Sequence, residues 1–273
     1  MSHAAFGHGL YEAESRLAAR LAVRLRDRKA VRQALLARLP QPSPHTRERL
    51  ADKLLQRLWG GQSPFPFLRL VAELTDGRAR RQLLLHRIAD TDTLVGALAR
   101  EVFLPYVLRG ALPKGIGAAP PPPRDLRLPG FTETKEAPSA LPADPLIAFA
   151  SRAWQAPPTS TLRALTILRQ CGVLARLPHP GRHPGAYLPT GAPPALPAFV
   201  YLLHEEALWP GGGVRSVRAA LGVPFLRLFL VKPPLPEALL ADAAECGFVR
   251  LRGGRVSARW PDPEALVDRL LAA

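Results

Sequence analysis

Residues 236–260, PEALLADAAECGFVRLRGGRVSARW, decide the fold class of the last part of this chain. Residues 236–246 have the apolar spacing of a helix, and Gly247 is a typical residue to end one. Two short alternating segments follow, residues 248–251 and 256–260, and Gly253-Gly254 between them is a strong turn signal. The stretch therefore predicts a helix that leads directly into a basic β-hairpin.

Two more helices are expected just before this stretch. Residues 196–208 are apolar and helical in spacing, and residues 214–221 predict a short helix that carries Arg215 and Arg218. Three helices followed by a hairpin are the elements of a winged-helix unit, a helix-turn-helix extended by a β-hairpin. The intervening residues 225–234 make the connection longer than is usual in that motif.

A similar order occurs earlier in the chain. Residues 144–154 and 160–171 predict two helices, the second capped by Thr159 or Ser160 and ended by Gly172. An extended segment at Val173-Leu174 and a basic loop over residues 178–185 follow. The sequence therefore predicts one or two winged-helix units.

The N-terminal residues predict only helices. Leu17, Leu21, Leu25, Val31 and Leu35 share one apolar face, which predicts a single helix up to Pro40, with Glu12 four residues before Arg16 as a favourable pair. Further helices are expected from His45 and over residues 66–75, 78–89 and 92–109, the last kinked or shortened by Pro105. This half is expected to be an all-α bundle.

These patterns divide the chain into four consecutive parts. We expect an α-helical bundle over residues 1–109, a Pro/Gly-rich linker over 110–145, a winged-helix-like segment over 146–194 and a C-terminal winged-helix domain over 195–273. Four consecutive prolines at 120–123 favour an extended polyproline spacer in the linker. The fold class is mainly α.

The charge of the chain points to a polyanionic partner. The chain has 273 residues and a formal net charge of +15, with 32 arginines and 5 lysines. Residues 1–58 have 12 basic and 5 acidic side chains, and residues 146–194 have five basic side chains and no acidic one. Biased codon usage could explain the preference for arginine over lysine but not this uneven excess of bases. Nucleic acid is the simplest partner, and an anionic membrane or an acidic protein would also satisfy the charge.

The sequence contains no motif that predicts catalysis, a metal or a cofactor. His204-Glu205-Glu206 lacks the second histidine of a zinc-protease helix, so we interpret it as a helix surface. Asp90 and Asp92 are interpreted as helix-capping residues, and His179 and His183 as a poor metal pair. Cys171 and Cys246 form no paired motif and are expected in the core, which favours a reducing compartment.

The composition also predicts where the protein is located in the cell and whether its nucleic-acid partner is single- or double-stranded. Arginines interrupt the N-terminal region early and no long apolar helix is evident, so we expect a cytoplasmic protein with no secretory signal and no membrane partner. Aromatic residues are only 7% of the chain, which disfavours base stacking on single strands and favours contacts to a duplex backbone.

Four stretches within residues 9–177 resemble the small A subunit of BREX phage-defence systems. They are the opening GLYEAESR at 9–16, SPHTRER at 43–49, the helix pair over 70–77 and 79–88, and Trp154 with STLR at 160–163 and the segment 168–174. The resemblance implies an α-helical protein with a winged-helix portion that binds DNA, with other phage-defence subunits as partners.

The sequence therefore leads to one expectation and several open alternatives. We expect a non-enzymatic, double-stranded-DNA-binding accessory protein that works through arginine–phosphate contacts and needs no cofactor or metal. A winged-helix transcriptional regulator, an RNA-binding factor and a protein–protein adaptor remain open. The candidate DNA-binding residues are Arg47, Arg49, Lys53, Arg163, Arg169, Arg182, Arg215, Arg218, Arg250, Arg252 and Arg255, with Arg259 also in the hairpin.

Overall fold

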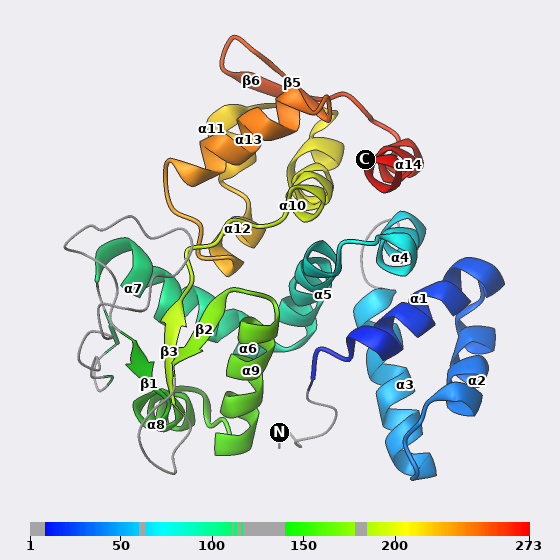
Figure 1. Cartoon of the computed structure of the whole chain (residues 1–273), viewed down its shortest axis with the longest axis vertical. Coiled ribbons are helices and arrows are strands. Elements are labelled where there is room, and N and C mark those ends of the chain that lie inside the picture. The colour runs from blue at the N-terminus through cyan, green and yellow to red at the C-terminus, as the bar shows by residue number, and fades with distance from the viewer. Residues whose placement is uncertain (1–8, 60–63, 111, 114–115, 117–139, 178–184) are drawn as a thin grey trace. The chain divides into compact units, whose positions relative to one another are not determined.

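The computed structural model describes residues 9–59, 64–110, 112–113, 116, 140–177 and 185–273 (Figure 1). These residues are mainly helical, with two small antiparallel sheets, which confirms the mainly α class (Figure 1). None of the described helices is long and apolar enough to cross a lipid bilayer.

The chain forms two compact units, each built from separate segments. The first unit contains Met1–Gly9, Asp92–Pro193 and Pro224–Pro236, and the second contains Leu10–Thr91, Pro194–Val223 and Glu237–Ala273. The segments of the two units therefore alternate along the chain.

The second unit begins with five helices. These are α1 (Glu12–Leu25), α2 (Arg28–Arg38), α3 (Pro44–Leu58), α4 (Pro64–Glu73) and α5 (Gly77–Thr91). Helix α1 packs against α4 and α2, and α3 packs against α5. Buried side chains such as Leu54, Phe67 and Leu83 form the core between them.

The prediction of one helix through Leu35 is wrong. Arg26 has a left-handed backbone with φ 53°, which ends α1. Asp27 then starts α2 as its N-cap, because its Oδ1 accepts a hydrogen bond from the Ala30 N–H at 2.7 Å. The apolar face continues across the break, which is why its spacing alone suggested one helix.

The first unit begins with a helical stretch in three parts. It consists of α6 (Thr93–Ala97), a π-helical stretch η1 (Leu98–Phe103) and α7 (Leu104–Arg109). Pro105, which has no N–H, lies in the first turn of α7, where a missing donor is tolerated. The chain accommodates this proline by a wider turn before it, as the Leu104 N–H donates to the Ala99 carbonyl.

Each unit contains a three-stranded antiparallel sheet, and both sheets have the same strand order. The first sheet has the order β1 (Leu141–Pro142), β3 (Ala186–Pro189), β2 (Leu174–Leu177). The second has the order β4 (Val214–Ser216), β6 (Arg255–Ala258), β5 (Val249–Arg252). In both sheets, the strand that comes last in the sequence lies in the middle and pairs with the other two.

Two of these strands correct the sequence predictions. Strand β1 and the start of helix α8 (Ala143–Trp154) lie within the predicted linker, where Leu141 pairs with Tyr187. Strand β4 occupies the first part of the helix predicted over 214–221, so Arg215 is in a strand and helix α11 covers only Val217–Leu221. The glycines predicted to end helices and form the hairpin turn are confirmed.

Helices α9 (Pro158–Gln170) and α13 (Leu235–Glu245) turn into strands in the same way. A cysteine and a left-handed glycine follow each helix, Cys171-Gly172 and Cys246-Gly247, and both glycines have φ 76°. The next N–H donates back into the helix at 2.9 Å in both cases, from Val173 to Leu168 and from Phe248 to Ala243. The two corners are therefore the same Schellman motif.

The remaining elements complete the two units. They are α12 (Pro224–Leu228) in the first unit and, in the second, α10 (Leu196–Leu203), the π-helical η2 (His204–Leu208), the short 3₁₀ turn η3 (Trp209–Gly211) and α14 (Pro263–Ala272). Helix α14, which the sequence analysis did not predict, packs on α4, where Arg69 bonds to Asp268 at 2.7 Å.

Candidate nucleic-acid interface

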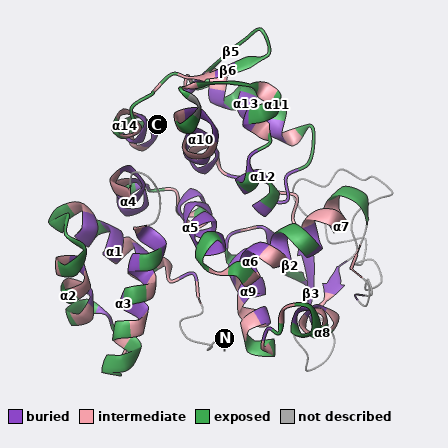
Figure 2. Cartoon of the chain, turned by 180° about the vertical axis from the view of Figure 1, so that it is seen from behind, coloured by how far each residue is buried: buried purple, intermediate pink, exposed green. Residues whose placement is uncertain are grey.

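The β5–β6 hairpin presents three arginines on one face. Arg252 pairs with Arg255 across the hairpin, and Arg250 pairs with Ser257, so these side chains leave the same side of the sheet. Val249 and Val256 lie on the opposite side and are buried, which fixes the arginine side outward. The outer end of the hairpin is exposed in Figure 2.

These arginines form no ion pair with an acidic side chain of the described residues. Arg250, Arg252 and Arg255 are exposed, and none forms an ion pair with any described carboxylate. In contrast, Arg32 is paired with Asp52 at 2.6 Å and Arg69 with Asp268. The positive charge of the hairpin is therefore available to a ligand.

Backbone hydrogen bonds hold the hairpin in place at its outer turn and at its base. The Val217 N–H, at the start of α11, donates to the Gly254 carbonyl at 3.0 Å, and the Ala258 N–H donates to Gly213 at 2.7 Å. Arg218, exposed, is the next residue of α11. We refer to Arg218, Arg250, Arg252 and Arg255 together as the hairpin surface.

Two other arginines of this region have internal contacts. Arg215 is exposed, but it pairs with Val256 on the side of the sheet opposite Arg250, Arg252 and Arg255, and its Nε donates to the Ala207 carbonyl at 3.2 Å. The Arg259 guanidinium lies beside Gly247, at the C-terminal end of α13. Its Nη1 is 3.1 Å from the position that a Cβ added to Gly247 would take. Both side chains are exposed, and each also contacts another part of the unit, so we do not include them in the hairpin surface.

In the first unit the candidate arginines lie on α9. Arg169 is exposed and Arg163 is half-buried, and the exposed Arg176 on β2, which the sequence analysis did not select, adds to them. Arg182, His179 and His183 lie outside the described residues.

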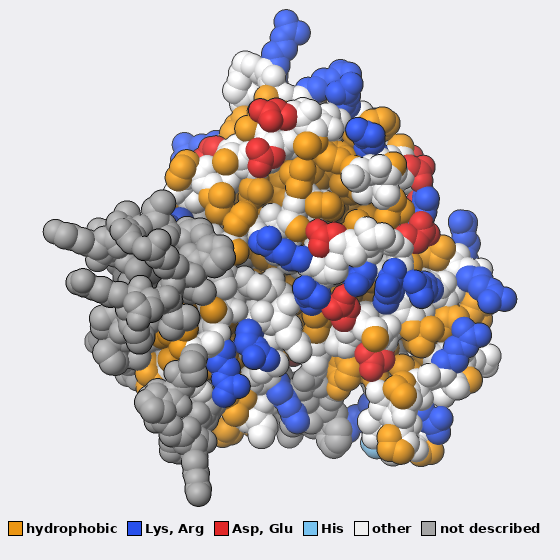
Figure 3. Space-filling model, in the orientation of Figure 1, with side chains coloured by type: hydrophobic (Ala, Val, Ile, Leu, Met, Phe, Trp, Pro, Cys, Tyr) orange, Lys and Arg blue, Asp and Glu red, His pale blue; other side chains and the backbone are white. Residues whose placement is uncertain are grey.

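The candidate residues of the N-terminal helices are less exposed than expected. Arg47, Arg49 and Lys53 are half-buried on α3. The exposed bases lie instead where α1 meets α2, and Figure 3 shows the corresponding group of blue side chains; they are Arg20, Arg24, Arg26, Arg28 and Lys29. The every-fourth-residue spacing of Arg20, Arg24 and Arg28 was the sequence signal for this group.

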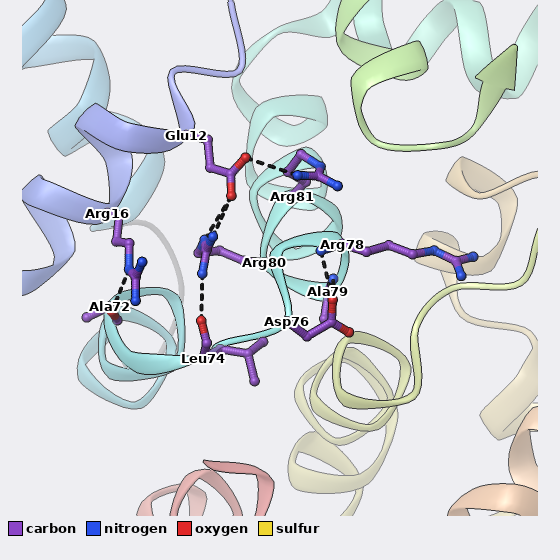
Figure 4. A network of polar contacts seen from close by, with 9 residues as sticks. All are labelled: Glu12, Arg16, Ala72, Leu74, Asp76, Arg78, Ala79, Arg80 and Arg81. Atoms are coloured by element: carbon purple, nitrogen blue, oxygen red, sulfur yellow. Dashed lines mark hydrogen bonds and ion pairs between the residues drawn. The ribbon is translucent and has the colours of Figure 1, made fainter. Parts of the chain in front are cut away.

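Several arginines serve the fold rather than a surface, as the network in Figure 4 shows. The Glu12 carboxylate accepts hydrogen bonds from Arg80 at 2.6 Å and from Arg81 at 3.3 Å. Arg80 also donates to the Leu74 carbonyl at 2.6 Å, and Arg16 donates to Ala72 at 3.0 Å. Glu12 therefore connects α1 to α5, in place of the Glu12–Arg16 pair expected from the sequence.

A polar cluster in the second unit was also misread from the sequence. His204 is fully buried, Glu205 forms an ion pair with Arg87 of α5, and Glu206 lies 2.5 Å from His86 Nε2 of α5, at hydrogen-bond distance. Burial lowers the pKa of His204 to about 4, so its ring is neutral near pH 7. These residues are internal and not a helix surface, because their partners come from a distant part of the chain.

The structure also tests the predictions for the cysteines and for the two aspartates assigned to helix caps. Cys171 is buried as expected, whereas Cys246 is exposed, which corrects its assignment to the core. Asp92 occupies an N-cap position but its side chain forms no capping bond, and Asp90 lies inside α5. Within the described ranges, no three His, Cys, Asp or Glu side chains gather in a way that could hold a metal ion.

Comparison with known proteins adds no relative: no family model, no curated protein and no solved structure matches this chain.

Proposed function

We propose that this chain is a non-enzymatic protein that binds double-stranded DNA through arginine–phosphate contacts. The observation that carries the proposal is the hairpin surface, where three arginines from two paired strands lie on one face without an acidic partner among the described residues. A guanidinium donates two parallel hydrogen bonds to a phosphate, so such a face suits a regular array of phosphates.

The order of elements supports a winged-helix interpretation of both repeated parts. In each, a strand precedes two or more helices, the last helix turns at a glycine into a second strand, and a hairpin returns a third strand to the middle of the sheet. This is the order in which winged-helix proteins place a recognition helix beside a hairpin. Helix α12, between α11 and α13, is the departure from that order in the second part.

The chemistry of the hairpin surface favours duplex over single-stranded nucleic acid. Its side chains are arginines, and the neighbouring Trp260 is directed inward, where its Nε1 donates to the Gly247 carbonyl at 3.2 Å. Single-strand binding uses aromatic rings as stacking platforms, and this surface offers none. Phosphate contact along a duplex is therefore the better fit.

A salt titration of binding tests the proposal. Fluorescence anisotropy with a labelled duplex DNA is expected to give a log K that falls linearly with log salt, by about 0.9 for each phosphate neutralised. The Arg252→Glu/Arg255→Glu variant is expected to lower affinity by at least about tenfold and to reduce that slope by about 2. Single-stranded DNA and duplex RNA of the same sequence are expected to bind more weakly.

A matched control separates local contact from net charge. Arg255→Glu alone and Arg269→Glu each change the net charge by −2. Arg269 lies on the exposed side of α14, away from the hairpin, and its substitution is expected to leave affinity within about twofold, whereas Arg255→Glu lowers it by about tenfold. Equal losses in both variants, or a salt-independent affinity, would overturn the proposal. Preference for duplex RNA would support the RNA-binding alternative, and protection of a palindromic site would support a transcriptional regulator.

The phage-defence setting rests on the resemblance of residues 9–177 to the BREX A subunit. We propose it as the biological context of the DNA binding. Genes for a methyltransferase and an ATPase beside this one, together with co-purification of their products, are the expected result. A gene neighbourhood without any defence component would remove this part of the proposal and leave DNA binding to stand on its own.

A further inference from the structure

The two parts that share a strand order also share the position of one helix. Helices α9 and α13 each end in Cys-Gly with φ 76° at the glycine, and each turns with the same pair of backbone hydrogen bonds into the second strand of its group. Helix α13 is therefore the counterpart of α9. In a winged-helix protein this is the helix expected to lie on the DNA.

The outward faces of these two helices have opposite charge. The exposed and half-buried residues of α9 include hydroxyl, amide and guanidinium groups and no acid; the polar ones are Thr159, Ser160, Arg163, Thr166, Arg169 and Gln170. The exposed residues of α13 include three carboxylates and no base; they are Glu237, Ala238, Ala241, Asp242 and Glu245. A phosphate backbone would be attracted to the first face and repelled by the second.

The acidic side chains of α13 are not paired with bases of the described residues. Glu237, Asp242 and Glu245 form no ion pair with any described residue. Figure 3 shows the resulting separation of charge, with red and orange side chains over α13 and blue side chains at the hairpin. The positive and negative groups of this unit are on different elements.

We propose that the second unit binds duplex DNA with its hairpin surface alone and keeps α13 away from the DNA. This inference rests on the proposed function and specifies which surface performs it. In the first unit α9 carries the contact, whereas in the second the contact passes to Arg218, Arg250, Arg252 and Arg255. The two repeated parts therefore use different elements for the same ligand.

A DNA-cleaving probe attached to a cysteine tests directly which surface of the second unit lies near the DNA. Cys246 is exposed at the end of α13, whereas Cys171 is buried, so a thiol-linked iron chelator is expected to attach at Cys246 in the whole protein. This probe is expected to produce no cleavage of a bound duplex DNA. The same probe on Ser257→Cys in a Cys246→Ser background, on the arginine face of the hairpin, is expected to cut both strands near the bound site. Strong cleavage from Cys246 would overturn the inference.

Charge variants give an independent readout if the cysteine variant folds poorly. Glu237→Lys/Asp242→Lys is expected to change affinity by less than about twofold, because α13 stays away from the phosphates. An increase of about tenfold or more, with a steeper salt dependence, would place α13 on the DNA and overturn the inference. If the unaltered protein binds DNA and α13 contacts that DNA, only this inference fails. If the unaltered protein binds no nucleic acid, the proposed function fails as well.

Discussion

Arg252 and Arg255 face each other as a cross-strand pair beside the hairpin turn. Like charges directly opposite one another in a sheet destabilise the pairing. The hairpin therefore keeps an unfavourable arrangement in the free protein that an anion would relieve.

This pair predicts opposite effects of one substitution on stability and binding. Arg255→Glu places a carboxylate opposite Arg252, and the new ion pair is expected to raise the free energy of unfolding by about 0.5 kcal/mol. The same change should lower affinity for duplex DNA by about tenfold. Urea denaturation and anisotropy measure the two effects. A variant that is less stable and binds normally would contradict this interpretation.

The bond from Val217 to Gly254 predicts that the hairpin is held in place before binding. Val217 is the first residue of α11 and Ser216 before it is extended, with ψ 149°, so Val217→Pro fits the backbone and removes the N–H donor, together with the valine side chain. We expect a loss of about 1 kcal/mol in stability and faster hydrogen exchange at Gly254 and Arg255. Val217→Ala, which keeps the donor, should retain slow exchange; similar exchange in both variants would refute the role of this bond.

The Glu12 network predicts a larger loss than an exposed ion pair. Glu12→Gln leaves Arg80, with a side chain only 10% exposed, without its carboxylate, and should cost about 2 kcal/mol. Asp52→Asn breaks the exposed pair with Arg32 and should cost less than about 1 kcal/mol. Urea denaturation of both variants checks the order, and equal losses would show that the Glu12 network adds nothing to an ordinary surface pair.

The buried His204 predicts acid sensitivity. Because burial lowers its pKa from 6.5 to about 4, the unfolded chain binds the additional proton first as the pH falls. Stability should be fully present above about pH 6.5 and should fall toward pH 4, by roughly 3 kcal/mol at the limit. His204→Met should flatten this part of the curve of unfolding free energy against pH. His45→Gln, at an exposed position, should leave it unchanged, and an equally steep curve for His204→Met would exclude this histidine as the cause.

Local signals explain what the sequence predicted well. The hairpin turn at Gly253-Gly254 and the glycines after α9 and α13 depend on backbone preferences of a few neighbouring residues, so they can be read directly. The two- and three-residue strands β1 and β4 could not, because their partners, Tyr187 and Val256, lie more than 40 residues away in sequence.

Distant partners also explain the errors in the candidate site. Nothing near Glu205 indicates that Arg87 will reach it, and nothing near Arg215 indicates that its Nε will bond to the backbone of Ala207. A basic side chain can be counted from sequence, but its availability depends on which carboxylates and carbonyls the fold brings to it. Arg250, Arg252 and Arg255 could be placed on one face from the sequence, because their strand alternation and the turn between the strands depend only on neighbouring residues.

Strand β5 pairs with β6 on one side only, which makes it the edge of its sheet. Its outer N–H and C=O groups form a template onto which a strand of another molecule could add, and Leu251 there is 43% exposed. Arg250 and Arg252 on this strand repel a second copy of themselves, so the charges that we assign to DNA binding would also keep the protein from aggregating. Replacing them with valine or alanine should therefore yield strand-paired oligomers, whereas reversing their charge should yield a soluble protein that no longer binds.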